Sequence, residues 1–88
     1  MPDPTVTILY FARLREALGK ATEKLTLPAG VRDLASLRAL LCARGGAWGE
    51  ELAQSRPVRA AVNQDVARGD TPVNDGDEIA FFPPVTGG

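Results

Sequence analysis

The stretch DEIAFFPPVTGG, residues 77–88, decides how the rest of the sequence is arranged. Its first part, residues 78–82, is a short apolar run typical of a buried strand. Two prolines follow, and they cannot extend a ladder of backbone hydrogen bonds because they lack an N–H group. Since so apolar a strand is unsuited to a free sheet edge, we expect it to lie centrally, beside the first strand of the chain.

β-branched and aromatic runs predict the other strands. They are residues 5–11, 21–28 and 58–63, with a weak short strand around Val66. Between the first two strands, good helix formers that end at Gly19 predict a helical turn. The sequence NDGD at residues 74–77 predicts the turn into the last strand.

The hydrophobic period becomes helical after Asp33, a residue suited to an N-cap. Leu34, Leu37 and Leu41 share one narrow arc of this helix. The pair Gly45–Gly46 is expected to end it.

Three side chains on or near this helix carry further expectations. Arg38 lies beside the apolar arc, so its stem should follow the core edge while its head reaches water. Cys42 is expected to be a half-buried, inert thiol. A short second helical piece is predicted within residues 47–55, where Trp48 should pack over the end of the main helix.

A single amphipathic helix can cover only one face of a sheet, which favours a small mixed sheet wrapped across it. The predicted fold class is therefore α+β: a β-grasp, ubiquitin-like arrangement with the C-terminal strand in the centre. We expect a β-grasp domain over residues 1–82 and an extended C-terminal tail over residues 83–88.

Alternation along the strands separates a core face from an outer face. The core face takes Val6, Ile8, Tyr10, Ile79 and Phe81, and the outer face takes Leu9, Phe11, Ala80 and Phe82. If the first and last strands are parallel neighbours, Phe11 and Phe82 lie together at the tail end of the sheet, where Val66 can complete an apolar patch. The alternative is that one of these aromatic residues belongs to the core.

Composition excludes several classes of function. The 88 residues suffice for one domain, and the net charge of −1 comes from scattered residues without a basic block, so no nucleic-acid partner is expected. No apolar stretch is long enough to span a membrane, and the start lacks the pattern of a signal peptide. A single cysteine favours a reducing, cytoplasmic compartment.

The chain contains no histidine, the commonest general base and metal ligand. With one cysteine, no zinc-binding spacing and no Cys–His or Ser–His pair exists, so we expect no metal site. The sequence TPVNDGDE fails as a calcium loop because Phe82 stands where a bidentate glutamate belongs. GGAWG lacks the spacing of a phosphate-binding loop and is predicted to end the main helix and connect it to the next segment.

The tail is the remaining candidate for chemistry. Pro83 and Pro84 prevent it from folding back onto the sheet and hold it extended. Glycine adds no side chain, so the last residues can enter a slot only as wide as a backbone. The reactive group that this geometry presents is the α-carboxylate of Gly88, which needs activation and delivery to another protein's active site.

The residues FFPPVTGG at the end, ILYFARLREALG at residues 8–19 and AAVNQDVARGDTPVNDGDE at residues 60–78 are similar to those of a known family. Together they resemble the small, sulfur-carrier subunits of molybdopterin synthase over nearly the whole chain. A terminal Gly-Gly is shared by all ubiquitin-like carriers, whereas the Phe-Phe-Pro-Pro run is typical of this family.

The resemblance implies a function and a set of partners. A ubiquitin-activating-like adenylyltransferase would use ATP to adenylate the Gly88 carboxylate, and a sulfur donor protein would convert it to a thiocarboxylate. The tail would then enter the large synthase subunit and give its sulfur to a cyclic pyranopterin phosphate precursor. This chain would bind no cofactor and would not turn over alone, and two small and two large subunits would form a heterotetramer.

The resemblance also assigns roles to residues. Those expected to insert with the tail are Pro83, Pro84, Val85, Thr86 and Gly87. Those expected to bind the large subunit are Phe11, Val66 and Phe82.

Three alternatives remain open. The chain could be a related carrier for thiamine synthesis or tRNA thiolation, a ubiquitin-like modifier joined to lysines through Gly88, or an interaction module with an inert tail.

Overall fold

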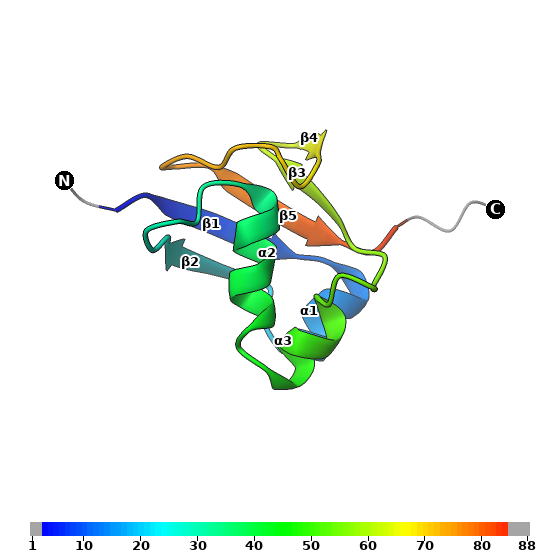
Figure 1. Cartoon of the computed structure of the whole chain (residues 1–88). Helices are drawn as coiled ribbons and strands as arrows, with labels where there is room; N and C mark the ends of the chain where they lie inside the picture. Colours follow the sequence, from blue (N-terminus) through cyan, green and yellow to red (C-terminus); the bar gives the residue numbers. More distant parts are fainter. Residues whose placement is uncertain (1–2, 85–88) are drawn as a thin grey trace.

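The computed structural model describes residues 3–84. Five strands and three helices follow one another along this part of the chain (Figure 1). They are β1 (Thr5–Tyr10), α1 (Ala12–Leu18), β2 (Thr22–Thr26), α2 (Leu34–Cys42), α3 (Gly46–Glu51), β3 (Arg59–Val62), β4 (Asp65–Ala67) and β5 (Glu78–Phe82). The expected β-grasp architecture is confirmed.

The five strands form one mixed sheet in the order β2-β1-β5-β3-β4. β5 is central, as predicted: it pairs in parallel with β1, where Tyr10 lies beside Phe81, and antiparallel with β3, where Ala60 lies beside Phe81. Because β1 and β5 are parallel, both end at the same edge of the sheet, which is where the tail begins (Figure 1).

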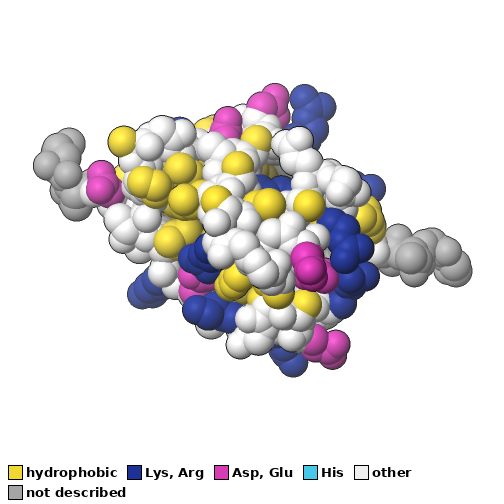
Figure 2. Space-filling view, turned by 60° about the horizontal axis from the view of Figure 1, so that its bottom comes forward, with side chains coloured by type: hydrophobic (Ala, Val, Ile, Leu, Met, Phe, Trp, Pro, Cys, Tyr) yellow, Lys and Arg dark blue, Asp and Glu magenta, His cyan; other side chains and the backbone are white. Residues whose placement is uncertain are grey.

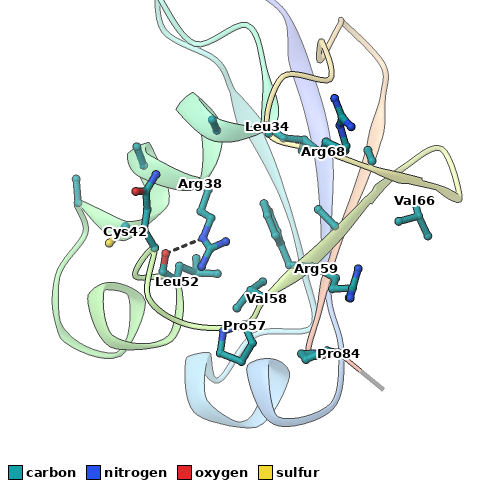
Figure 3. A pocket seen from close by; sticks show the side chains of 18 residues that line it. Leu34, Arg38, Cys42, Leu52, Pro57, Val58, Arg59, Val66, Arg68 and Pro84 are labelled. Carbon is teal, nitrogen blue, oxygen red and sulfur yellow. Dashed lines mark hydrogen bonds between the residues drawn. The ribbon is translucent and has the colours of Figure 1, made fainter. Parts of the chain in front are cut away.

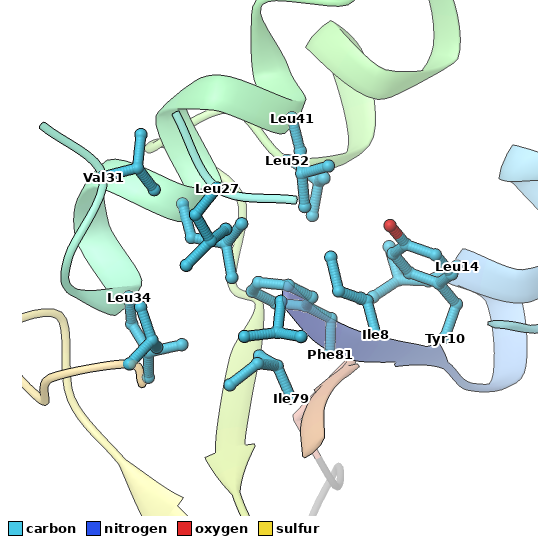
Figure 4. Packing of buried hydrophobic residues seen from close by; sticks show 13 residues of the cluster. Ile8, Tyr10, Leu14, Leu27, Val31, Leu34, Leu41, Leu52, Ile79 and Phe81 are labelled. Atoms are coloured by element: carbon cyan, nitrogen blue, oxygen red, sulfur yellow. The ribbon is translucent and has the colours of Figure 1, made fainter. Parts of the chain in front are cut away.

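Helix α2 crosses one face of the sheet and closes the core (Figures 1 and 4). It begins at Asp33, whose side chain accepts a hydrogen bond of 2.8 Å from the backbone N–H of Ser36, while the Ser36 hydroxyl satisfies the N–H of Asp33 at 3.2 Å. This reciprocal cap uses two N–H groups that a helix start otherwise leaves unpaired. The predicted arc of Leu34, Leu37 and Leu41 is buried.

The core side chains are those expected from strand alternation. Val6, Ile8, Tyr10, Ile79 and Phe81 are all at most 1% exposed. Figure 4 shows Phe81 beside Ile79 and Ile8 in the middle of this cluster, with Leu52 above them. The prediction that Phe81 and not Phe82 faces the core is therefore confirmed.

A polar and aromatic cluster joins four segments at one side of the core. The Tyr10 hydroxyl donates to a Glu23 carboxylate oxygen at 2.7 Å, and Arg44 donates to both Glu23 oxygens at 3.0 and 2.9 Å. The Arg44 guanidinium lies 4.3 Å from the centre of the Trp48 ring, which meets Tyr10 edge-on. Trp48 thus packs beyond the end of α2, as predicted. Burial and the bond to Glu23 raise the pKa of Tyr10, so its hydroxyl stays protonated.

Some expected boundaries differ from the structure. Gly45 and Gly46 do not end α2, which closes at Ala43 with right-handed backbone angles. They begin α3 instead, with φ of 79° and 54°, a region that glycine enters without steric cost. The turn between β3 and β4 is tight because Asn63 and Gln64 both have positive φ.

Removing the central aromatic side chain tests the core assignment. Phe81→Ala should lower the free energy of unfolding by about 3–5 kcal/mol, because it leaves a cavity under α2. Phe11→Ala is the control, since the Phe11 side chain is 46% exposed, and it should cost less than about 1 kcal/mol. Urea denaturation of both variants measures the difference, and equal losses would contradict this assignment.

Acid should remove the stabilisation that Glu23 provides. Burial acts to raise the pKa of Glu23, but hydrogen bonds from Arg44 and Tyr10 outweigh it and hold the pKa below its ordinary value of 4.5. A carboxylate with a depressed folded-state pKa stabilises the fold above its unfolded-state pKa, and this contribution is lost as the pH falls through the folded-state value.

Glu23→Gln should therefore be less stable than the native protein at pH 7, and the gap should narrow below the ordinary pKa of 4.5. Denaturation across this range measures the gap, with Glu16→Gln on the exposed side of α1 as the control. A gap that is constant with pH would argue against an ionised Glu23 in this cluster.

Candidate functional site

The site begins where β5 passes into the tail. Pro83 and Pro84 are half-buried and border a cavity of about 240 Å³. Its other lining residues come from α1 and from the segment between α3 and β3: Arg13, Leu14, Glu51, Arg56, Pro57 and Val58. The predicted tail residues Val85, Thr86, Gly87 and Gly88 lie outside the described residues, so their roles remain predictions.

Basic side chains gather beside the end of the described chain (Figure 2). Glu51 lies between two of them, 3.2 Å from Arg13 and 3.5 Å from Arg56. The two arginine side chains are 59% and 42% exposed, so each pair contributes little stability on its own. Their effect is to join α1 to the segment against which the prolines lie.

Arg38 holds this same segment from the other side. Its guanidinium donates hydrogen bonds to the carbonyl oxygens of Leu52 at 2.8 Å, Ala53 at 2.5 Å and Arg56 at 2.9 Å. Arg38 is half-buried, so it lies at the edge of the core as expected, but its head also binds these three carbonyl groups, which the sequence did not predict. Burial lowers the pKa of Arg38, yet arginine stays charged in proteins. Arg38 thereby holds residues 52–56, and Arg56 borders the same cavity as Pro83 and Pro84.

A larger groove of about 750 Å³ runs between α2 and the β3–β4 hairpin (Figure 3). Arg38 reaches into it from α2, and the dashed line in Figure 3 marks its hydrogen bond to the Leu52 carbonyl oxygen. Pro57 and Pro84 lie at the end nearest the tail. α2 contributes the small side chains of Ala35 and Ala39 to the lining of this groove.

The outer face of the sheet carries the apolar patch predicted from the sequence. Strand registers place Leu9, Ala80, Ala61 and Val66 in one row across four strands. At the tail end, Phe82 lies in β5, and the backbone N–H of Phe11 donates to the Phe81 carbonyl at 3.2 Å. Phe11 is 46% exposed, Val66 is 72% exposed and Phe82 is half-buried on the face opposite the core. The three residues therefore share one face, while their binding role remains a prediction.

Cys42 is half-buried, as expected, with its sulfur 3.7 Å from the Gly49 carbonyl oxygen. Within residues 3–84, no group of three or more acidic or cysteine side chains is placed to hold a metal ion. No helix in the same range is both long and apolar enough to cross a bilayer.

The sequence did not predict two sets of contacts: the pairing of Glu23 with Arg44, and the hydrogen bonds from Arg38 to the segment after α3. Glu23 and Arg44 are 21 residues apart, and Arg38 contacts residues 14 to 18 positions away. No spacing or motif signals such contacts, because they depend on how the helices dock. The outer-face position of Phe11 and Phe82, in contrast, follows from strand alternation and was predicted.

Comparison with known proteins places this geometry in a family. Residues 8–88 match the model of the ThiS family. The molybdopterin synthase sulfur carrier subunit of Escherichia coli (strain K12) is 40% identical over 83 residues, which covers 94% of this chain and 99% of the relative.

Two solved structures share the fold. One is the complex of subunits 1 and 2 of the molybdopterin-converting factor from Helicobacter pylori 26695, whose matching chain has a TM-score of 0.65, 26% identity and coverage of 96% of this chain and 99% of that chain. The other is SAMP1 from Haloferax volcanii, with a TM-score of 0.71, 26% identity and coverage of 96% and 99%. The chain therefore belongs to the ThiS family of β-grasp proteins, and within it to the molybdopterin synthase sulfur carrier subunits.

Proposed function

We propose that this protein carries sulfur for molybdopterin synthesis as a thiocarboxylate at Gly88. The observation that carries the proposal is the position of the tail root: Pro83 and Pro84 leave the end of the central strand beside the outer-face aromatics. A partner that binds this face would receive the tail directly. The 40% identical relative is named a sulfur carrier subunit, which supports the same conclusion.

The chemistry occurs at one carboxyl group. An adenylyltransferase of the ubiquitin-activating type joins the Gly88 carboxylate to AMP from ATP and releases pyrophosphate. A sulfur donor protein then supplies sulfur, which displaces AMP and leaves the thiocarboxylate. In the large subunit, sulfur passes to a cyclic pyranopterin phosphate, and two such transfers build the dithiolene. The carrier itself holds no cofactor.

The acid–base groups for these steps belong to the partners. The chain has no histidine, and proton transfer at neutral pH requires a group with a suitable pKa close to the reacting atoms. The small subunit therefore acts as the sulfur-donating part of a sulfurtransferase and does not turn over alone. We expect a heterotetramer of two small and two large subunits. The subunit 1 and 2 complex of Helicobacter pylori is a precedent for pairing of the two chains.

A second candidate function has one observation in its favour. SAMP1 has the same fold at 26% identity, and a related solved structure bears the name small archaeal modifier protein 1. A modifier would join Gly88 to lysines of other proteins. Intact-mass measurement of the protein from cells distinguishes the two: a carrier gains sulfur in place of one oxygen, whereas a modifier appears in isopeptide conjugates.

Changes at the C-terminus should abolish sulfur transfer and leave the fold intact. Deletion of Gly88, or addition of one residue after it, should prevent thiocarboxylate formation in a reconstituted assay with activating enzyme, sulfur donor and ATP. Gly87→Ala should act mainly by blocking entry of the tail into the partner's active-site channel, because the added methyl group widens the inserted segment. Circular dichroism checks the fold. Full pterin synthesis with the truncated carrier would rule out the delivered-tail mechanism.

The outer-face aromatics should contribute to binding of the large subunit. Phe82→Ala should weaken binding by about 2 kcal/mol or more, roughly thirtyfold, as for other central aromatic anchors. Its melting temperature should change far less than that of Phe81→Ala. Titration calorimetry with the large subunit measures binding, and Phe11→Ala and Val66→Ala test the rest of the patch. Normal binding by Phe82→Ala would show that the large subunit binds elsewhere.

A further inference from the structure

The outer face of the sheet divides into two halves along its strands. The half near the tail is apolar, formed by Leu9, Ala80, Ala61, Val66 and the two aromatics already described. The half far from the tail is polar: Thr5 of β1 is the register partner of Thr26 of β2, and Thr7 lies on the same face of β1. In the polar half the charges balance, because Thr7 lies between Lys24 of β2 and Glu78 of β5.

One charged residue of the strands lies in the apolar half. Arg59 is the register partner of Phe82, and it precedes Ala60, which faces α2 beside Phe81. Alternation therefore places the Arg59 side chain on the outer face, next to Phe82. In Figure 3, Arg59 and Val66 both project from the hairpin on the side away from α2.

The charge of Arg59 is not balanced by the described part of the chain. Arg59 is exposed and makes no ion pair or side-chain hydrogen bond with any residue between 3 and 84. The acidic side chain of β5, Glu78, lies at the opposite end of that strand from Phe82. Nothing in this part of the fold requires a cation at position 59.

An unpaired arginine beside the outer-face aromatics, the half-buried Phe82 and the exposed Phe11, has the composition of a binding site. Arginine, phenylalanine and tyrosine are enriched in interfaces, and arginine binds carboxylates through two parallel hydrogen bonds. When apolar contacts around such a pair exclude water, loss of either charge weakens binding strongly. The chemistry that complements Arg59 is therefore an aspartate or glutamate next to an apolar pocket.

We propose that Arg59 is a specificity-determining residue, which binds a carboxylate of the large subunit while Phe82 occupies the adjacent apolar pocket. This inference rests on the proposed function. It adds that the large-subunit surface recognised by the carrier is negatively charged next to the pocket for Phe82. The aromatics supply affinity, and Arg59 fixes orientation and disfavours partners without an acidic group at this place.

The test is titration of the complete carrier with the large subunit at several salt concentrations. Arg59→Gln should weaken binding about tenfold and Arg59→Glu about thirtyfold or more, because the latter places like charges together. Arg59→Lys should restore part of the affinity, since it keeps the charge but loses the bidentate geometry. The salt dependence of the dissociation constant should fall in Arg59→Gln relative to the native protein.

Lys24→Gln provides the matched control, because it removes the same charge from the polar half of the same face. It should bind like the native protein. Melting temperatures of all variants should agree, since Arg59 has no partner within residues 3–84. Native affinity in Arg59→Gln and Arg59→Glu, or an equal loss in Lys24→Gln, would overturn the role of Arg59. Phe82→Ala in the same titration tests the docking face separately. If the native carrier does not bind the large subunit, both the proposed function and the role of Arg59 are overturned.

Discussion

The structure depends on the burial of β5 between two neighbouring strands. Its core-facing residues, Ile79 and Phe81, lie under α2 and have almost no exposed surface. Burying side chains of this size provides about 1.5–3 kcal/mol each, which is large compared with the net stability of a small domain. Because β5 is the last strand, this burial also sets the place and direction in which the tail leaves the fold.

Side-chain hydrogen bonds fix the surroundings of the tail. Arg38 binds three carbonyl groups of the segment that follows α3, and Glu51 pairs with Arg13 of α1 and with Arg56 of that segment. On the other side of the core, Glu23 binds Tyr10 and Arg44. These contacts connect short helices that would be unstable alone. Pro83 and Pro84 therefore lie beside a segment that Arg38 connects to α2 and Glu51 connects to α1.

The fold separates the proposed tasks of the molecule. The face under α2 holds the core, the outer face carries the aromatics and Arg59, and the tail carries the proposed reactive carboxyl group. Such a division suits a protein that is handled by several partners in turn. In the proposed function, a partner that binds the outer face brings its own active site to the tail.

The sequence by itself determined the architecture and the face of each central strand. Alternation in β1 and β5 and the period of α2 are local patterns that follow from backbone geometry, so Phe81 could be assigned to the core and Phe82 to the outer face. The end of α2 and the surroundings of Arg38 were decided only by the tertiary structure. Gly45 and Gly46 serve the start of α3, and Arg38 finds its carbonyl partners after α3 has docked. Hydrogen bonds between segments far apart in the chain depend on the three-dimensional position of each segment, which no local pattern contains.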